Sequence, residues 1–276
     1  MAPMNATPIG VFDSGVGGLS VLRELRRQLP HEDIVFVADQ GHVPYGARPL
    51  SEVRGFADGI ARFLIDRPVK LIVVACNTAS AAALKTLRAA YPTIPFVGME
   101  PAVKPAAEQT KTKAVGVLAT PATFQGELFA SVVERFAAGV AVIPQTIPGL
   151  VERIEAGDLD GPETRALVAQ ALAPLRARRV DTLVLACTHY PFVIPVISEL
   201  AGPGVQVIDP SPAVARQTVR LVNELGLQAP PDRKGGLELL TSGEPLQLAT
   251  MALRLIGERA PATGVVWRDG GLALAP

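Results

Sequence analysis

The sequence predicts an α/β fold with parallel sheets, arranged as two related domains, and three observations lead to this prediction. Short, continuously apolar runs rich in Val and Ile alternate with amphipathic segments along the chain. Strands of this kind are typical of parallel sheets, in which both faces of the sheet are buried. The run LIVVAC at 71–76 resembles TLVLAC at 182–187, and 276 residues are enough for two domains.

Eight apolar runs are expected to form strands, and the segments between them are expected to form helices. Apolar residues recur at helical spacing within 53–64 and within 124–136, which predicts a helix in each segment. Regular alternation of strands and helices favours α/β units joined by right-handed crossovers. The expected strands are 9–12, 34–39, 70–76, 95–99, 114–120, 140–145, 182–187 and 205–209.

An internal repeat divides the chain. Besides the two similar runs named above, IGVFDS at 9–14 resembles VGVLAT at 115–120 with nearly the same offset. We therefore expect one domain over about 1–98 and a second over about 99–208. The remaining segment, 209–276, contains two helical patterns but is short for a third domain, so we expect it to pack on one of the others.

The composition excludes several classes of protein. Lys and Arg total 26, as do Asp and Glu, so the zero net charge argues against a general polyanion binder and no nucleic acid is required as a partner. The N-terminal residues lack the regions of a signal peptide, and the apolar runs are far shorter than the ~20 residues of a membrane span. Two cysteines cannot form a disulfide framework. We expect a soluble, cytoplasmic protein that does not contact a membrane.

Metal and pyridoxal phosphate sites are not indicated by the sequence. The motifs CxxC and HExxH are absent. None of the six lysines lies in a motif that follows a strand, which argues against a Schiff base with pyridoxal phosphate. The expected chemistry therefore uses no cofactor and no metal.

Polar residues follow several of the expected strands. Ligands in open α/β sheets bind beyond the carboxyl ends of the strands, so these residues are candidates for one shared site. The groups that follow strands are Asp13 to Gly18, Gln40 to Gly46, Cys76 to Thr78, Thr120 to Thr123 and Cys187 to Pro191.

Both cysteines of the chain, Cys76 and Cys187, end an apolar run and precede an expected helix start. Asn77 or Thr78 could cap the first helix, and Pro191 suits the first turn of the second. The positive end of a helix lowers the pKa of a thiol placed there and favours the thiolate. A free cysteine can also be a small buried apolar residue, but the equivalent placement of both in two repeats favours a functional pair.

Other polar residues near these strands have more than one interpretation. The glycine-rich run from Asp13 to Gly18 could bind phosphate, but it lacks the GxGxxG spacing and a Walker lysine, so a tight turn is the alternative. Asp13 could act in the site or cap a helix. His189 could be a general acid, a helix cap or a metal ligand. Glu152, in PGLVERIEAG, has the spacing of an exposed helical residue.

Two thiols that face one cleft, one from each domain, suggest proton transfer on both faces of a carbon. One thiol would take a proton and the other would return a proton to the opposite face, which inverts a stereocentre. The α-proton of an amino acid is weakly acidic, so a water-poor site with N–H and hydroxyl donors on the carboxylate would have to assist.

These motifs resemble those of the cofactor-independent aspartate/glutamate racemases. The resemblance covers about residues 8–225 and rests on VFDSGVGGLSVLREL, VPYG, VVACNTASAAAL and ACTHYPF in this order. It implies two flavodoxin-like domains with parallel sheets, related by a pseudo-twofold axis, with the active site in the cleft between them. It also implies that 209–276 returns to the first domain, 1–98, and that 99–208 is the second.

The resemblance further implies roles for individual residues. Cys76 would deprotonate the D-isomer with help from Asp13, and Cys187 would deprotonate the L-isomer. Glu152 and His189 would assist Cys187. Substrate contacts would come from Asp13, Ser14, Pro44, Tyr45, Gly46, Asn77, Thr78, Thr120, Thr123, Thr188 and His189.

The expected activity is the interconversion of L- and D-glutamate, which would supply D-glutamate for peptidoglycan synthesis in bacterial cell walls. Two alternatives are kept: an aspartate racemase, whose substrate is shorter by one methylene, and a two-lobed binding protein without catalysis. The chain departs from the family at residues 38–42, where Gly-Asp-Thr is usual, and at Ala186, where Gly is usual. The sequence leaves open whether the chain forms a homodimer.

Overall fold

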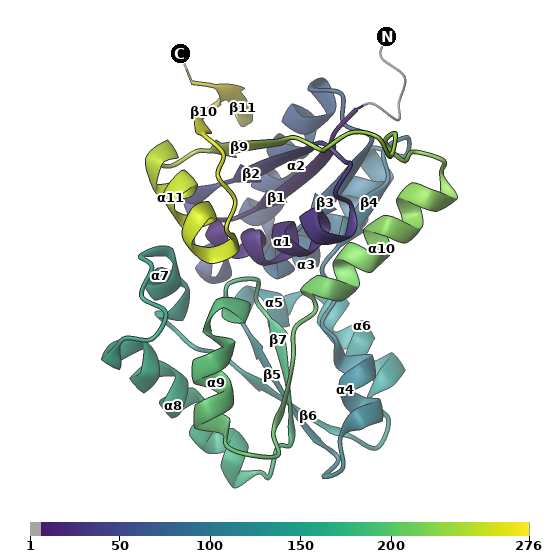
Figure 1. The fold of residues 1–276 in the computed structure, drawn as a ribbon. Helices are drawn as coiled ribbons and strands as arrows, with labels where there is room; N and C mark the ends of the chain where they lie inside the picture. The colour runs from purple at the N-terminus through teal and green to yellow at the C-terminus, as the bar shows by residue number, and fades with distance from the viewer. Residues whose placement is uncertain (1–6, 276) are drawn as a thin grey trace.

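The strands of residues 7–275, which the computed structural model describes, form two sheets (Figure 1). The first sheet has the order β11-β10-β9-β2-β1-β3-β4, and the second has the order β6-β5-β7-β8. Each sheet with its helices is called a lobe below. The strands are β1 Ile9–Asp13, β2 Ile34–Ala38, β3 Leu71–Val74, β4 Phe96–Gly98, β5 Ala114–Ala119, β6 Ala141–Gln145, β7 Thr182–Ala186, β8 Gln206–Ile208, β9 Leu237–Thr241, β10 Ala262–Arg268 and β11 Gly271–Leu274.

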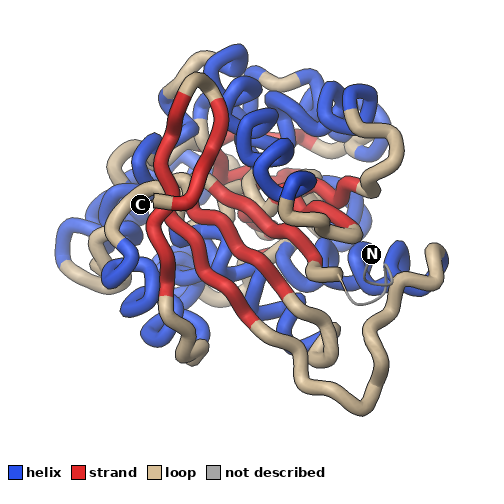
Figure 2. Tube along the Cα trace, turned by 90° about the horizontal axis from the view of Figure 1, so that it is seen from above, coloured by secondary structure: helices blue, strands red, loops and turns tan. Residues whose placement is uncertain are grey.

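Helices and short 3-10 turns connect the strands. In the view from above, helices lie on both sides of the first sheet (Figure 2). No helix that could span a membrane is found within 7–275. The helices are α1 Leu19–Gln28, α2 Leu50–Asp66, α3 Asn77–Ala90, α4 Val103–Gln109, α5 Pro121–Gln125, α6 Glu127–Phe136, α7 Leu150–Glu155, α8 Pro162–Ala177, α9 Ile194–Ala201, α10 Ser211–Glu224 and α11 Pro245–Ile256, and the 3-10 turns are η2 Val16–Gly18, η3 Gln40–His42, η4 Tyr45–Ala47 and η5 Tyr190–Val193.

The two sheets share one strand order. The set β2-β1-β3-β4 in the first corresponds to β6-β5-β7-β8 in the second, and all pairs within these sets are parallel. This order is that of flavodoxin-like folds, so the predicted fold class is confirmed. Strands β3 and β7 are equivalent, and Cys76 and Cys187 lie at their carboxyl ends.

Each of the eight runs expected to be a strand forms one, with bounds within two residues of those expected, but the tail of the chain differs from expectation. Residues 209–276 form the two expected helices, α10 and α11, and in addition β9, β10 and β11. Strand β9 pairs in parallel with β2, and β10 pairs with β9, so the tail extends the first sheet. The short run at 237–241 is stabilised by a partner far away in the sequence, which local patterns do not reveal.

The strands of the first sheet come from 9–98 and 237–274, and those of the second come from 114–208. On this basis we propose the domain division 1–98 with 209–276, and 99–208. Strands β10 and β11 form an antiparallel hairpin at one edge of the first sheet (Figure 2).

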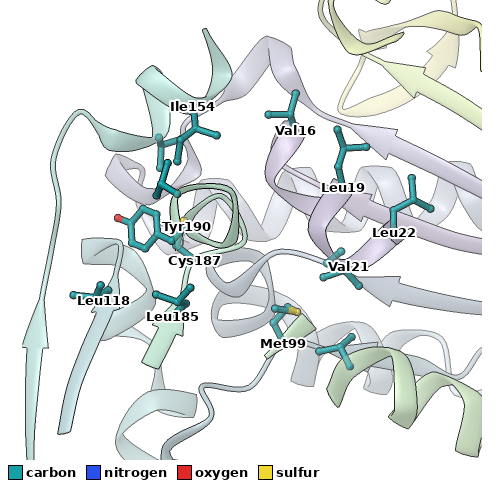
Figure 3. Packing of buried hydrophobic residues seen from close by; sticks show 14 of the residues in the cluster. Val16, Leu19, Val21, Leu22, Met99, Leu118, Ile154, Leu185, Cys187 and Tyr190 are labelled. Atoms are coloured by element: carbon teal, nitrogen blue, oxygen red, sulfur yellow. The ribbon is translucent and has the colours of Figure 1, made fainter. Parts of the chain in front are cut away.

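A buried hydrophobic cluster joins the two lobes. It contains Val16 and Leu19, which follow β1, together with Ile154 of α7 and Tyr190 of η5 (Figure 3). Cys187 belongs to the same cluster. Apolar packing therefore holds the turn that carries Cys187 against the start of α1 in the first lobe.

Candidate active site

Cys76 and Cys187 line one cleft between the two lobes. Both are free thiols, and their exposed fractions are 4% and 6%. The structure therefore brings together the two residues that the sequence selected as an acid–base pair. The cleft is also lined by Ser14, Pro44, Tyr45, Gly46, Asn77, Thr78, Thr120, Val151, Thr188 and His189.

Most of the substrate contacts expected from the sequence lie in this lining. Asp13 and Thr123 do not line the cleft but contact residues that do, since Asp13 accepts from Thr188 and Thr123 shares a hydrogen bond with Thr120. Val151, from the start of α7, lines the cleft and was not expected.

Cys76 is itself the N-cap of α3, which begins at Asn77. Its Sγ accepts a hydrogen bond from the N–H of Ala79 at 3.5 Å and lies 3.9 Å from Oγ of Ser14. The expectation that Asn77 or Thr78 caps this helix is wrong, because Cys76 is the last extended residue and both Asn77 and Thr78 are already helical. The catalytic candidate is thus fixed by the helix start rather than by a flexible loop.

Asp13 lies at the end of β1 beside Cys76 and is fully buried. Its Oδ2 accepts the N–H of Gly18 at 2.7 Å. Burial raises the pKa of Asp13, although His189 and the hydrogen bonds with Cys76 and Gly18 oppose this shift. Burial and the neighbouring Asp13 also raise the pKa of Cys76 well above its ordinary value. The expected lowering by the helix start is therefore outweighed at Cys76.

Cys187 directly follows β7, and the short turn η5 comes before α9, which begins only at Ile194. The helix that was expected directly after Cys187 therefore begins several residues later in the sequence. His189 lies beside this thiol, with its Nδ1 3.8 Å from Sγ of Cys187. Nε2 of His189 lies 2.6 Å from Oε1 of Glu155.

Hydrogen bonds determine the charges of His189 and Glu155. Burial lowers the pKa of His189, but its hydrogen bonds with Cys187 and Glu155 outweigh burial and raise that pKa well above its ordinary value. Burial raises the pKa of Glu155, but hydrogen bonds from His189, the N–H of Val16 and the amide of Gln40 outweigh burial and lower it. An imidazolium–carboxylate pair therefore lies beside Cys187.

The structure corrects the glutamate expected to assist Cys187. Glu152 is exposed on α7. Glu155, at the end of the same helix, is buried and accepts the N–H of Val16 at 2.7 Å in addition to its bond with His189. Helical spacing contains a signal for this choice, because Glu155 follows the buried Val151 by four residues and shares its face of the helix.

The glycine-rich run after β1 permits close contact between the lobes. A Cβ on Gly15 would lie 1.9 Å from Oε1 of Glu155, and a Cβ on Gly17 would lie 2.4 Å from Nδ1 of His189. The N–H groups of this turn already bind side chains, since Glu155 accepts from Val16. The structure therefore supports the tight-turn interpretation rather than a phosphate loop.

Hydroxyl and amide groups complete the cleft. The Oγ1 atoms of Thr78, Thr120 and Thr123 lie 2.9–3.2 Å from one another and join the two lobes. Asn77 is buried, and neither Nδ2 nor Oδ1 of its amide has a hydrogen-bond partner among the described residues. Unpartnered buried polar atoms cost free energy, so this amide, which lines the cleft, is a candidate ligand contact.

The arrangement suits proton transfer from two sides of a small polar molecule. One thiol is next to the buried carboxyl group of Asp13, and the other is next to the imidazolium of His189. Within residues 7–275 no group of three or more His, Cys, Asp and Glu side chains could hold a metal ion.

Comparison with known proteins shows which family this sequence resembles. The model of a family described as Asp/Glu/Hydantoin racemase matches residues 9–218. A protein named glutamate racemase from Roseiflexus sp. is 50% identical over 256 residues, which are 92% of this chain and 94% of the relative. Another, from Herpetosiphon aurantiacus, is 52% identical over 246 residues, or 89% of this chain and 96% of the relative.

Solved structures give the same result. A glutamate racemase from Bacillus anthracis has a TM-score of 0.86 and 32% identity, covering 97% of this chain and 99% of its own. The Escherichia coli glutamate racemase in complex with L-glutamate and an activator, UDP-MurNAc-ala, has a TM-score of 0.82 and 31% identity, covering 94% of this chain and 98% of its own.

Proposed function

The chain belongs to the Asp/Glu/hydantoin racemase family, and we propose that it interconverts L- and D-glutamate by moving the α-proton between Cys76 and Cys187. The observation that carries the proposal is the placement of the two thiols at equivalent strand ends on one cleft. A binding protein without catalysis would have no need of this equivalence.

Two proton transfers convert L-glutamate to D-glutamate. Cys187, as a thiolate, takes the α-proton of L-glutamate and becomes a thiol. Cys76, as a thiol, gives its proton to the opposite face of the same carbon and becomes a thiolate. The product is D-glutamate, and the two thiols have exchanged their protonation states. The reverse reaction starts from the exchanged state.

The neighbours of the two thiols favour the starting state for the L-isomer. Asp13 and burial raise the pKa of Cys76 and so keep it protonated. The imidazolium of His189 stabilises negative charge that develops on the sulfur of Cys187, 3.8 Å away. We therefore assign Asp13 to the Cys76 side, and His189 with Glu155 to the Cys187 side.

Deprotonation at the α-carbon places negative charge on the α-carboxylate, and this charge needs hydrogen-bond donors. The unpartnered amide of Asn77 and the hydroxyl groups of Thr78, Thr120 and Thr188 line the cleft and can donate. Both thiols are almost completely buried, which limits water and strengthens these interactions. We propose these residues as substrate contacts, together with Ser14, Tyr45 and Gly46.

The proposal extends to the use of the product. D-glutamate is an unusual amino acid whose main bacterial use is in peptidoglycan, so we propose that the chain supplies D-glutamate for cell-wall synthesis. Depletion of the protein in its host, with and without added D-glutamate, tests this part. If depletion stops growth and added D-glutamate does not restore it, this part of the proposal is contradicted.

Exchange of the α-proton tests the reaction itself. In deuterated water, the purified protein should incorporate deuterium at the α-carbon of both L- and D-glutamate while racemising them. L- and D-aspartate, measured in parallel, test the preference between substrates that differ by one methylene, for which a pocket can supply ~1–3 kcal/mol of discrimination. Binding of glutamate without exchange would contradict the proposal.

A further inference from the structure

The amide of Gln40 connects the tail of the chain to the Cys187 side of the cleft. Gln40 begins η3, directly after β2 and Asp39, and is half-buried. Its Nε2 donates to Oε2 of Glu155 at 3.1 Å. Its Oε1 accepts from the hydroxyl of Thr241, at the end of β9, at 2.9 Å.

The orientation of this amide is determined by its neighbours. The N–H of Gly243 donates to Oγ1 of Thr241 at 2.9 Å, so the hydroxyl hydrogen of Thr241 is free to donate to Oε1 of Gln40. A carboxylate of Glu155 can only accept, which requires the NH₂ end of Gln40 on its side. Both requirements select the same orientation of the amide.

The two oxygens of Glu155 thus have different partners. Oε1 accepts from Nε2 of His189 and from the N–H of Val16, at 2.6 and 2.7 Å. Oε2 accepts from Gln40. The carboxylate is therefore held from both lobes, because Gln40 and Val16 belong to the first lobe whereas Glu155 and His189 belong to the second.

We propose that Gln40 is a positioning residue for the Cys187 half of the reaction, acting through Glu155 and His189. The inference rests on the proposed function and adds to it. Gln40 holds the carboxylate that holds the imidazolium 3.8 Å from Cys187. The Cys76 half has its own neighbour, Asp13, whose carboxylate accepts hydrogen bonds from Gly18 and Thr188 rather than from Gln40 or His189. Loss of the Gln40 amide should therefore slow proton transfer at one thiol and not at the other.

Racemisation rates cannot separate the two halves. The enantiomers of glutamate have equal free energies in water, so the equilibrium constant is one and kcat/KM must be equal in both directions for every variant. Elimination of chloride from a β-chloro-glutamate does separate them. One thiolate takes the α-proton, the Cα–Cβ double bond forms, and chloride leaves with the Cβ–Cl electron pair, so no second thiol has to return a proton.

The experiment compares chloride release from the L- and D-forms of this analogue. Cys187→Ser and Cys76→Ser serve as references that identify the enantiomer handled by each thiol. Gln40→Met keeps the length of the side chain and removes both polar atoms. One enantiomer of the analogue is no longer processed by Cys187→Ser. For that enantiomer, Gln40→Met should slow elimination about tenfold, which is the effect of losing one hydrogen bond to a charged group. Elimination from the other enantiomer should be unchanged.

The matched control is Gln247→Met. Gln247 also donates to Glu155, but to its backbone carbonyl oxygen, at 3.3 Å, and its removal leaves the carboxylate contacts intact. This variant should eliminate from both enantiomers at the wild-type rate. Thr241→Val, which removes the donor that orients Gln40, should give the same enantiomer preference as Gln40→Met with a smaller effect. Equal Tm values for the variants establish that folding is retained.

This inference is overturned if Gln40→Met slows elimination from both enantiomers equally, or from neither. The proposed function still stands in that case, provided that the wild-type protein racemises glutamate. A wild-type protein that neither racemises glutamate nor exchanges its α-proton overturns the proposed function, and this inference with it.

Discussion

The hydroxyl of Thr188 donates to the carboxyl group of Asp13 across the contact between the lobes, with Oγ1 and Oδ1 3.4 Å apart. Thr188 directly follows Cys187, and Asp13 lies beside Cys76. The two thiol-bearing strand ends are therefore joined directly through their neighbours. A displacement of one lobe against the other would disturb both halves of the site.

Substitution of either thiol should abolish racemisation but leave half of the chemistry. A serine hydroxyl is a much weaker acid and base than a thiol, so Cys76→Ser and Cys187→Ser should each be nearly inactive in both directions. Cys187→Ser should still eliminate chloride from the D-form of β-chloro-glutamate through Cys76, and Cys76→Ser from the L-form through Cys187. If both variants process the same enantiomer only, the assignment of one thiol to each face is wrong.

Glu155 rather than Glu152 should support catalysis. Glu155→Gln removes the charge that faces His189, and weakening of a hydrogen bond between charged groups by about 1.5–3 kcal/mol predicts a decrease in kcat/KM of about 10- to 150-fold. Glu152→Gln, on the same helix but exposed, is the control and should racemise glutamate at the wild-type rate. The reverse result would restore the assignment made from the sequence.

The pair formed by His189 and Glu155 should make stability depend on pH. The pKa of His189 is raised above 6.5, so its contribution is complete below that pH and is lost as pH rises through the higher value in the folded protein. The pKa of Glu155 is lowered below 4.5, so its contribution is present above pH 4.5 and is lost as pH falls through the lower value.

A double-mutant cycle measures this dependence. Urea unfolding of the wild type, Glu155→Gln, His189→Asn and the double variant should give a coupling free energy of about 1.5–3 kcal/mol between pH 4.5 and 6.5. The coupling should decrease in strongly alkaline buffer, where His189 is neutral. A coupling that grows with pH would contradict the imidazolium state.

A methyl group at Gly17 should disturb the Cys187 side. The Cβ of Gly17→Ala would lie 2.4 Å from Nδ1 of His189, so the imidazole has to move. We expect a loss of about 1–3 kcal/mol of stability and a decrease in kcat of about 100-fold, since a displacement of ~1 Å has effects of this size. Gly55→Ala is the control: it lies in α2 with no atom near the new Cβ, and it should stabilise the fold by about 0.8–1 kcal/mol.

Activity should not depend on a metal or on pyridoxal phosphate. The expected acid–base groups are thiols, and the strand ends provide no lysine for a Schiff base. Dialysis against a chelator should leave the rate of glutamate racemisation unchanged, and so should a preparation without pyridoxal phosphate. Activity that is lost on dialysis and returns when either is added would refute this prediction.

The sequence alone was sufficient for features that depend on local patterns. Continuous apolar runs identified the eight strands from β1 to β8, and the repeat of LIVVAC in TLVLAC placed Cys76 and Cys187 at equivalent strand ends. These features follow from the periodicity and polarity of adjacent residues, which each segment carries by itself. The strand-end rule then predicted that both thiols belong to one site.

The tertiary structure decided which groups face each thiol. The choice of Glu155 over Glu152, the bond from Gln40 and the addition of β9 beside β2 all depend on contacts between residues that lie far apart in the chain. The pKa of Cys76 is raised because burial and Asp13 outweigh the helix start, and burial exists only after the lobes have packed. Local sequence patterns specify the strands and helices, but distances and charges across the cleft are set only when the two lobes meet.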